Sequence, residues 1–520
     1  MRNITKTIPA LLLVIATAGC TDDDSFTTRT DHLLTFAQDT VSMDTVFSRV
    51  PTSRKSFWIY NKSGDGIRCT NVRLANGNQS GFRVNIDGTY LGEESGYQIS
   101  DLEIRRNDSV FVNLELTARD NNKIGPQYME DNLVFQLESG VQQKVNLNAY
   151  SWDAEIIKNL TIKGDTLITS QKPIVVYGPL TIDSLSTTTI APGTTLYFHN
   201  NGKLDVYGRL VANGTPDRNI VFRTDRTEHM FSYLPYDMVS GMWNGIHFHT
   251  SSYSNVMDYT DTHGCFNGIV CDSSDVSRQK LSLTNSIVHN CQGYGLKLTN
   301  CNTSIKNCQL SNVLNDCVAV IGGQASILSS TIAQFYPFDS NYGAALSFTN
   351  QTTDDQLLKH TYPLLKMDCV NSIVTGYADD VVMGSNPDTT AVYTFMFENC
   401  ILRTDSLEQS ENVKNVIWEK ADSVETDTVY GGKKNFKLVD GQTQHYDFHL
   451  SPVSKAIGAA STDAKYALQT DREGTPRDSQ PDMGCYEYVA PAGEDDKSTQ
   501  GATPSQLPAR SKRRSINLRK

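Results

Sequence analysis

The chain lacks the excess of positive charge that a nucleic-acid-binding protein needs. Charged residues make up 20% of its 520 residues, and the formal net charge is -12, so we expect no nucleic-acid partner. The sequence also lacks a nucleophile elbow, a phosphate-binding loop and a zinc motif. The sequence therefore gives no support for a nucleotide-binding protein, a serine hydrolase or a zinc enzyme of the common kinds. Its function has to be inferred from weaker patterns.

Cysteine pairs with metal-binding spacing are missing as well. The chain has eleven cysteines, six of them from Cys265 to Cys317, but no CxxC pair and no Cys/His spacing typical of a metal site. Small thiols stacked inside successive repeats would explain the cluster. An exported protein can form disulfides, although their pairing cannot be deduced from sequence. We favour mostly buried thiols, and predict neither a metal nor a cofactor.

The N-terminus has the form of an export signal. Arg2 and Lys6 flank the start of an apolar stretch, residues 8–18, that is too short to cross a hydrocarbon core of about 30 Å. Small residues then precede Cys20, and residues 17–20 resemble a lipobox. This resemblance implies a lipoprotein signal peptide over 1–19 and a membrane partner reached through lipid on Cys20. The alternative is an ordinary cleaved signal with an incidental cysteine.

An acidic run follows the cysteine. Asp22, Asp23 and Asp24 lie in an expected linker over 20–30, and the run resembles the surface-export signal of Bacteroidetes lipoproteins. The resemblance implies an outer-membrane, lipid-anchored protein that faces the cell exterior. A plain solvated spacer is the other interpretation.

Residues 31–150 have the pattern of an antiparallel sandwich. Alternating runs such as 56–60, 110–114 and 132–135 are separated by turn signals rich in glycine, aspartate and serine. Strands and turns at this spacing predict an immunoglobulin-like β-sandwich. A Cys…Trp…Cys arrangement of true immunoglobulin domains is absent.

Residues 155–435 repeat without helical segments. Similar runs start at Asn285, Asn307 and Ser329, which are 22 residues apart, and again at Asn371 and Asn399 after gaps of 42 and 28. Repeats with two strand-like runs each predict a solenoid. About ten to thirteen coils at about 4.8 Å each would give a rod of about 50–60 Å, with asparagine ladders at its corners.

The first of these repeats resemble a known family. The runs over 190–198, 202–215, 220–223 and 243–248 are similar to the opening coils of bacterial right-handed parallel β-helix proteins, the pectate-lyase-like fold. With the N-terminal features, the chain resembles uncharacterised Bacteroidetes surface lipoproteins of this fold. The resemblance implies an all-β chain, a sandwich followed by a right-handed parallel β-helix.

The end of the chain resembles the C-terminal closure of many bacterial β-helices. Over 436–488 we expect Asp471, Arg477, Asp482 and Glu487 to form a charge-assisted network that covers the last coil. The basic, Pro/Ser/Thr-rich tail over 489–520 predicts disorder.

Catalysis has four candidate residues. Asp316 lies in a strand that faintly resembles the paired-Asp strand of polygalacturonases, but the second Asp and the other elements of that family are absent. Asp258, Asp261 and His263 lie close together in sequence, and a pectate-type lyase would use such carboxylates to hold Ca²⁺. A corner or surface role is the simpler interpretation of all four.

Binding has its own candidates. His247 and His249 alternate and so share one face of their strand. Aromatic side chains near the insertions can stack on sugar rings, and the candidates are Trp243, Tyr253, Tyr259 and Tyr336. We therefore expect glycan recognition or adhesion without catalysis. The alternatives are a polysaccharide lyase or glycoside hydrolase acting in a groove near 243–342, and a structural surface protein.

Overall fold

The computed structural model describes residues 25–169, 171–231, 233–407, 410–420 and 432–490, and Cys20 and most of the tail lie outside these ranges. Within them every regular element is a β-strand or a short 3-10 helix, so the prediction of an all-β chain is confirmed. No helix of the described residues is long and apolar enough to cross a membrane.

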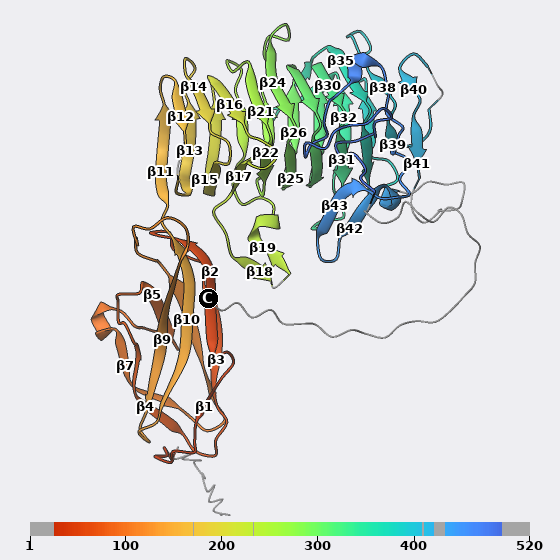
Figure 1. Cartoon of the computed structure of the whole chain (residues 1–520). Coiled ribbons are helices and arrows are strands. Elements are labelled where there is room, and N and C mark those ends of the chain that lie inside the picture. The colour runs from red at the N-terminus through yellow and green to blue at the C-terminus, as the bar shows by residue number, and fades with distance from the viewer. Residues whose placement is uncertain (1–24, 170, 232, 408–409, 421–431, 491–520) are drawn as a thin grey trace, which may run out of the picture.

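The N-terminal part consists of two five-stranded sheets packed on each other (Figure 1). One sheet has the order β1 (Leu34–Phe36), β3 (Lys55–Asn61), β8 (Ser109–Leu116), β5 (Phe82–Ile86) and β6 (Thr89–Tyr90). The other has the order β2 (Thr40–Phe47), β10 (Gln142–Trp152), β9 (Gln127–Leu137), β4 (Ile67–Leu74) and β7 (Gln98–Ile104). Alternate residues of β8 are buried, as expected for strands with one face on a core. The immunoglobulin-like class of this sandwich stays a prediction.

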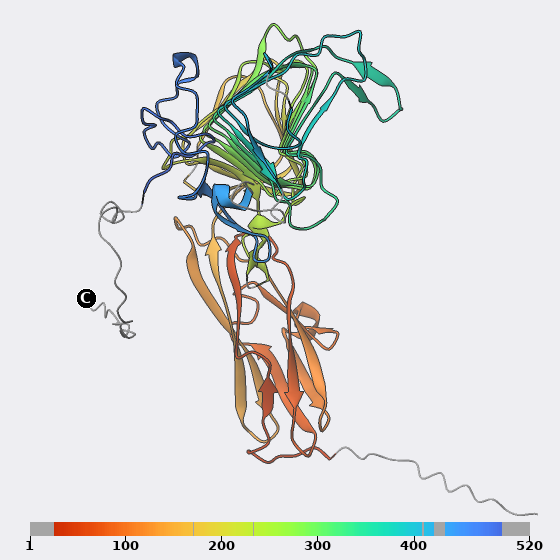
Figure 2. The ribbon, with the colours of Figure 1, turned by 90° about the vertical axis from the view of Figure 1, so that its right-hand side faces the viewer.

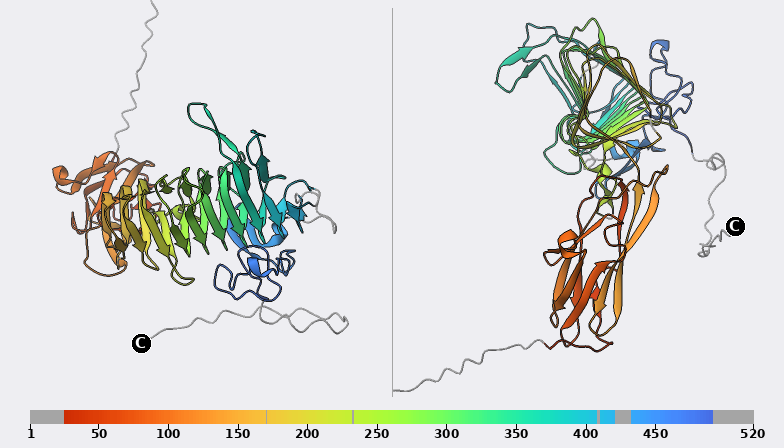
Figure 3. Two further views of the ribbon diagram at one scale, coloured as in Figure 1. Left: turned by 90° about the horizontal axis from the view of Figure 1, so that it is seen from above. Right: turned by 90° about the vertical axis from the view of Figure 1, so that its left-hand side faces the viewer.

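From β11 onward the chain winds into stacked three-sided coils, which Figure 2 and the right panel of Figure 3 show end-on. The first two faces share the strands β11 (Glu155–Ile162), β13 (Ile174–Ile182) and β15 (Thr195–Val206), which bend from one face to the other. The first face continues with β17 (Ile220–Thr224), β22 (Thr260–His263), β25 (Ile287–Cys291), β28 (Gln309–Val313), β31 (Thr331–Gln334), β36 (Ile373–Gly376), β39 (Ile401–Arg403) and β41 (Ile417–Glu419). The second face continues with β20 (Ile246–Phe248), β23 (Ile269–Cys271), β26 (Leu296–Thr299), β29 (Val318–Ile321), β32 (Leu346–Thr349) and β37 (Val382–Ser385).

The third face is a ten-stranded sheet. Its strands are β12 (Thr166–Ile168), β14 (Thr187–Ile190), β16 (Arg209–Asn213), β21 (Asn255–Asp258), β24 (Gln279–Thr284), β27 (Asn302–Lys306), β30 (Gly323–Leu328), β35 (Leu364–Val370), β38 (Met396–Glu398) and β40 (Val413–Lys414). All pairings between coils are parallel, so the long parallel sheets confirm the predicted β-helix.

The interior of the coils is apolar and includes thiols. All ten described cysteines are free and buried, and the sulfur atoms of Cys265 and Cys291 lie 3.5 Å apart on successive coils. The prediction of buried thiols is confirmed for these ten. Eight of them fill the narrow interior of the coils as small apolar residues, whereas Cys69 lies in the core of the sandwich and Cys485 in the C-terminal segment.

The corner between the third and first faces uses asparagine. Asn285, Asn307, Asn371 and Asn399 have φ values of 48°, 53°, 52° and 51°, a left-handed conformation that asparagine tolerates better than most residues. The Asn307 side-chain amide donates to Asn285 Oδ1 at 3.0 Å. The expected ladder therefore forms here, and its members turn the chain from one face to the next.

The C-terminal segment does not cover the end of the last coil as the sequence predicted. Residues 451–488, which we call the strap, lie along the asparagine corner and reach back to early coils, where Arg472 donates to Asn219 Oδ1 at 2.8 Å. The hairpin before it, β42 (Phe436–Asp440) and β43 (His445–Leu450), packs on the outside of the first face (Figure 1). Exposed corner amides and an apolar outer face offer these residues more partners than a terminal coil does.

A long insertion follows β17 and joins the two parts of the molecule. It contains β18 (His229–Phe231), β19 (Leu234–Pro235) and the 3-10 helix η2 (Tyr236–Met238), and Figure 1 shows it between the coils and the sandwich. Thr227 Oγ1 donates to the Thr45 carbonyl at 2.5 Å, and Ser53 Oγ donates to Glu228 Oε1 at 2.7 Å.

Candidate functional site

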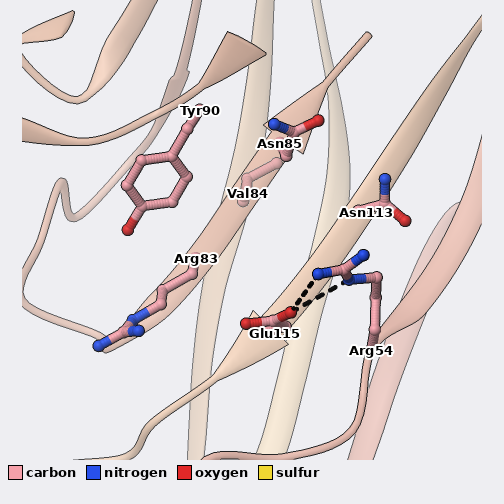
Figure 4. Close-up of a pocket in the computed structure, with 7 residues that line it drawn as sticks. All are labelled: Arg54, Arg83, Val84, Asn85, Tyr90, Asn113 and Glu115. Carbon is pink, nitrogen blue, oxygen red and sulfur yellow. Dashed lines mark hydrogen bonds and ion pairs between the residues drawn. The ribbon is translucent and has the colours of Figure 1, made fainter. Parts of the chain in front are cut away.

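One hollow lies on the sandwich rather than on the coils. It has a volume of about 410 Å³ and is lined by Arg54, Arg83, Val84, Asn85, Tyr90, Asn113 and Glu115 (Figure 4). The guanidinium of Arg54 donates twice to Glu115 Oε1, at 2.9 and 3.1 Å. This pair is largely in solvent, where such pairs contribute at most about 1 kcal/mol. The hollow is thus an open polar surface with one exposed ring, Tyr90.

A second cavity lies on the first face of the coils and combines polar groups with a charged cluster. We call it the groove. Its volume is about 290 Å³, and it is lined by Met238, Ile287, His289, Gln309, Ser311, Asn312, Tyr446, Asp447, Phe448, His449 and Tyr486. Strands β25 and β28 form the floor, while η2, β43 and the strap form the walls. The groove therefore exists only because two segments far apart in sequence pack on the same face.

His263 holds the charged cluster beside the groove together. Its Nδ1 lies 2.8 Å from Asp261 Oδ1, and its Nε2 lies 2.8 Å from Asp237 Oδ1. Asp261 and His263 alternate on β22 and share its outer face, whereas Asp237 comes from η2. Strand register places His289 beside His263 on the next coil, with its Nε2 3.4 Å from Asp261 Oδ1. Arg223 completes the cluster at 2.8 Å from Asp237 Oδ1.

The carboxylates keep His263 charged. Burial by itself lowers the pKa of an imidazole, but the charges and hydrogen bonds of Asp261 and Asp237 outweigh it and raise the pKa of His263 to about 10. Burial likewise opposes ionisation of Asp261, yet His263 and His289 hold its pKa well below the usual value. The pKa of Asp237 is also lowered, against its burial, by His263 and Arg223. At neutral pH His263, Asp261 and Asp237 therefore carry full charges.

The opposite wall carries a second histidine. His449 Nδ1 lies 2.6 Å from Asp447 Oδ1, and its ring packs on that of Tyr486 with centroids 4.2 Å apart. The Tyr486 hydroxyl donates to Gln309 Oε1 on the floor at 2.8 Å. Wall and floor are thus connected through the strap, and the side-chain NH₂ of Gln309 stays near the groove.

Asn312 brings an unsatisfied acceptor to the groove. The residue is 2% exposed, and its Oδ1 has no hydrogen-bond partner among the described residues. A buried carbonyl without a partner costs about 1–3 kcal/mol. Asn312 lines the groove, but its Oδ1 is buried, so a bound donor would reach it and remove this cost only after a rotation of the side chain.

The structure separates the catalytic candidates of the sequence. Asp258 ends β21 on the third face and accepts hydrogen bonds from Thr284 Oγ1 and Asn285 Nδ2, each at 2.8 Å. Tyr259, with a φ of 47°, turns the chain at this corner, so Asp261 and His263 lie on the first face instead. Asp258 and Asp261 do not belong to one site.

Asp316 has a structural environment. Its Oδ1 accepts from the Ala344 backbone N–H at 2.8 Å, and its Oδ2 accepts from Ser347 Oγ at 2.6 Å. The carboxylate therefore tethers two neighbouring coils at the corner between the first and second faces. It is a corner residue and does not line the groove.

The aromatic candidates are mostly engaged inside the protein. Trp243 is fully buried, donates from Nε1 to the His263 carbonyl at 2.8 Å and stacks on Phe198, so it is not available to a ligand. Tyr336 is buried and bonds Ser240 Oγ at 2.9 Å. Its hydroxyl fastens the insertion to the coils.

Tyr253 and Tyr259 lie outside the groove as well. The Arg278 guanidinium lies 3.6 Å from the centre of the Tyr253 ring, and the Tyr253 hydroxyl accepts from the Asp275 N–H at 3.1 Å. Tyr259 stands at the corner described above and is partly exposed. Neither ring lines the groove.

His247 and His249 share one face, as alternation predicts, but it is the second face. Their ring centroids are 3.9 Å apart. In the described ranges two groups place three possible metal-ligand atoms within 4.8 Å of one another: Asp205, His247 and His249 on the second face, and Asp261, His263 and His289 on the first.

Sequence reasoning missed most residues of the groove. His289 could have been found, because it occupies the position of His263 one coil later and coils repeat in register. Asp237, Asp447 and His449 carry no such signal. They come from an insertion and a terminal hairpin whose docking is decided by tertiary packing.

No family model matches the chain, and no curated protein matches it either. Among solved structures, the chain is similar to a protein of unknown function from Porphyromonas gingivalis W83, with 11% sequence identity and a TM-score of 0.17. That match covers 25% of this chain and 60% of that chain.

Two enzymes are also similar over a larger share of the chain. Pectate lyase Pel9A has 12% identity and a TM-score of 0.29, and the match covers 62% of this chain and 89% of that one. The catalytic unit of a GH87 alpha-1,3-glucanase from Streptomyces thermodiastaticus has 11% identity and a TM-score of 0.25, with 69% and 72% covered. Likenesses with such TM-scores carry no argument about the activity of this chain.

Proposed function

We propose that the chain is a lipid-anchored cell-surface protein that binds glycans in the groove on the first face of its β-helix, without catalysing a reaction. The observation that carries the proposal is a cavity of about 290 Å³ lined by polar side chains, one of which, Asn312, has a carbonyl oxygen without a partner among the described residues. Sugars offer many hydroxyl donors, and the groove adds acceptors and donors from Gln309, Ser311 and Asp447 beside the rings of Tyr446 and Tyr486. A cavity of this size accommodates roughly one or two sugar rings.

The charges of the cluster favour binding over hydrolysis. Glycoside hydrolysis needs a carboxylic acid whose raised pKa lets it donate a proton. The carboxyls of Asp447 in the groove and of Asp237 and Asp261 beside it have lowered pKa values and stay ionised. His263 is protonated at neutral pH, so it is not a base for proton abstraction by a lyase.

The proposed location at the membrane rests on Cys20 and the acidic residues after it. These residues would tether the chain, and the sandwich would lift the β-helix away from the membrane surface. The orientation toward the cell exterior belongs to the same proposal.

The test is a binding screen of the full chain against uronic-acid polysaccharides and host glycans. Two variants change the groove, His289→Ala and Asn312→Asp, and a third, Tyr90→Ala, changes the sandwich hollow. We expect each groove variant to weaken affinity about tenfold or more, equivalent to about 1.4 kcal/mol, and Tyr90→Ala to bind like the wild type.

Three other outcomes contradict the proposal. New reducing or unsaturated ends in the screen would show an enzyme. Loss of binding in Tyr90→Ala alone would assign recognition to the sandwich. A wild-type chain that binds no glycan of the panel would favour a structural role.

A further inference from the structure

Coil stacking builds a compact array of histidine and aspartate on the second face. Asp205 of β15 is paired in register with His247 of β20. Two residues later in each coil, Tyr207, His249 and Asp272 form a second row, since Val206 pairs with Phe248 and Phe248 pairs with Cys271. Parallel strands are about 4.8 Å apart, so four possible ligands from three coils converge without any loop.

The side chains of this array already point at one another. His249 Nε2 lies 3.1 Å from Asp205 Oδ1, and His249 Nδ1 lies 3.5 Å from Asp272 Oδ2. His247 Nε2 lies 2.8 Å from Asp272 Oδ1. Tyr207 stacks flat on the His249 ring, with centroids 3.9 Å apart and an interplanar angle of 1°, and this fixes the plane of the ring.

We propose that Asp205, His247 and His249 bind a divalent transition-metal ion, with zinc the expected metal, and that Asp272 orients the two histidines. Ligand atoms of the three residues lie within 4.8 Å of one another, a separation that an ion between them closes by small side-chain rotations. Two imidazoles and a carboxylate suit zinc and its neighbours in the transition series. A carboxylate on the second nitrogen of a ligating histidine is the usual support of such sites.

The array is open to a solvent ion. The side chains of His247 and Asp272 are 35% and 34% exposed, whereas Asp205 is nearly buried and anchors the site. Three protein ligands leave a coordination position for water or for an oxygen of a bound molecule. The site therefore resembles an accessible centre more than a closed structural one.

The first-face group is the natural comparison. His263 there has both ring nitrogens on carboxylates, at 2.8 Å each, and it carries a proton. A metal would have to displace that proton, at a large cost. The two groups have similar composition, but neither histidine of the second-face group has carboxylates within 2.8 Å of both ring nitrogens. His247 contacts one carboxylate, and His249 lies 3.1 and 3.5 Å from two.

Two lysines lie close to the proposed site. Lys203 Nζ is 2.8 Å from Asp205 Oδ2, and its half-exposed side chain competes with the ion for this carboxylate. Lys280 is buried and donates from Nζ to the carbonyls of His249 and Ser252, at 2.7 and 3.3 Å. Removal of the Lys203 charge should therefore increase metal affinity, and this gives a variant with a predicted gain.

The experiment measures zinc bound by the full chain, without a histidine tag, after EDTA treatment and dialysis against ZnCl₂. We expect His247→Gln/His249→Gln to lose one zinc equivalent relative to the wild type, or at least tenfold in affinity. His289→Ala, the matched first-face variant, should keep that equivalent, and Lys203→Met should bind more tightly. Thermal unfolding in EDTA checks that each variant is folded.

Cobalt absorption supplies a second measurement. A Co²⁺-loaded wild type should show ligand-field bands that the double variant lacks. Equal zinc binding by the double variant and the wild type would overturn the proposal, as would loss of zinc in His289→Ala instead. Because no glycan is present, these results do not depend on the groove.

Discussion

At the scale of residues, His263 shows how a coil surface fixes a charge. Alternation on β22 gives it Asp261 as a neighbour, and η2 supplies Asp237 on its other nitrogen. Neither carboxylate could be buried cheaply without the imidazolium, and the imidazolium could not be buried without them. Each of the three charges therefore stabilises the folded chain only in the presence of the other two.

This arrangement predicts a pH dependence of stability. The pKa of His263 is raised to about 10 in the folded chain and is about 6.5 when the chain is unfolded. The folded state thus holds the proton more tightly, and the stabilisation is complete below about pH 6.5 and is lost as pH rises toward 10. We expect thermal unfolding midpoints of the wild type to fall between pH 6 and pH 9.

The variant His263→Gln isolates this effect. It removes the cation that bonds both Asp261 and Asp237, which are partly buried and keep His289 and Arg223 as neighbours. We therefore expect it to be less stable by about 1.5–3 kcal/mol at pH 6. The difference in stability between the variant and the wild type should be smaller at pH 9, because the wild type loses the same interaction as the pH rises. Parallel midpoint curves for the two proteins over this range would contradict the assignment.

The sequence predicts residue pairs within a strand better than residues across corners. His247 and His249 share a face because strand side chains alternate with a period of two. Asp258 and Asp261 are only three residues apart in sequence, but Tyr259 turns the chain between them with a positive φ. Such a corner is invisible to alternation, since an aromatic residue gives no turn signal of the kind that glycine or asparagine gives.

At the scale of elements, the strap illustrates a second limit of the sequence. Its predicted charge network does form: Arg477 pairs with Glu487 at 3.0 Å and also donates to the carbonyls of Asp482 and Gly484. Its location differs from the prediction, because Arg477 also donates to Asn307 Oδ1 on the corner ladder at 2.9 Å. A motif indicates which residues bond one another, but not which exposed amides they will meet.

The variant Arg477→Ala should release the strap. The Arg477–Glu487 pair is almost completely buried, and removal of one partner from such a pair costs about 3–5 kcal/mol. We expect hydrogen exchange to increase over 456–487 while the interior strands of the coils stay protected. Lys465→Ala removes an exposed partner of Asp463 and serves as the control, with a change within about 0.5 kcal/mol. Equal protection of the strap in both variants would contradict its dependence on Arg477.

At the scale of the whole molecule, the repeat was predictable and the joint was not. The 22-residue spacing of Asn285, Asn307 and Ser329 reports a coil length, because each of these residues occupies the same left-handed corner. The contact between sandwich and coils involves Phe47, Val50, Ala154, Val175 and Tyr197. These are ordinary apolar residues, and nothing in their spacing distinguishes a joint from a core.

At this joint we expect one ring, that of Tyr197, to hold the sandwich and the coils at a fixed angle. Tyr197 meets Phe47 edge-on with centroids 4.7 Å apart, and its other neighbour is the Arg223 guanidinium at 5.5 Å. Truncation in Tyr197→Ala removes both contacts and costs about 3 kcal/mol at the joint. We expect a broader distribution of molecular dimensions in small-angle X-ray scattering, and a separate early unfolding transition in calorimetry. Tyr128→Ala, which removes an exposed ring of the sandwich, should change neither. If Tyr197→Ala scatters like the wild type, the polar contacts of Thr227 and Glu228 with the sandwich hold the angle by themselves, and the apolar cluster is dispensable for it.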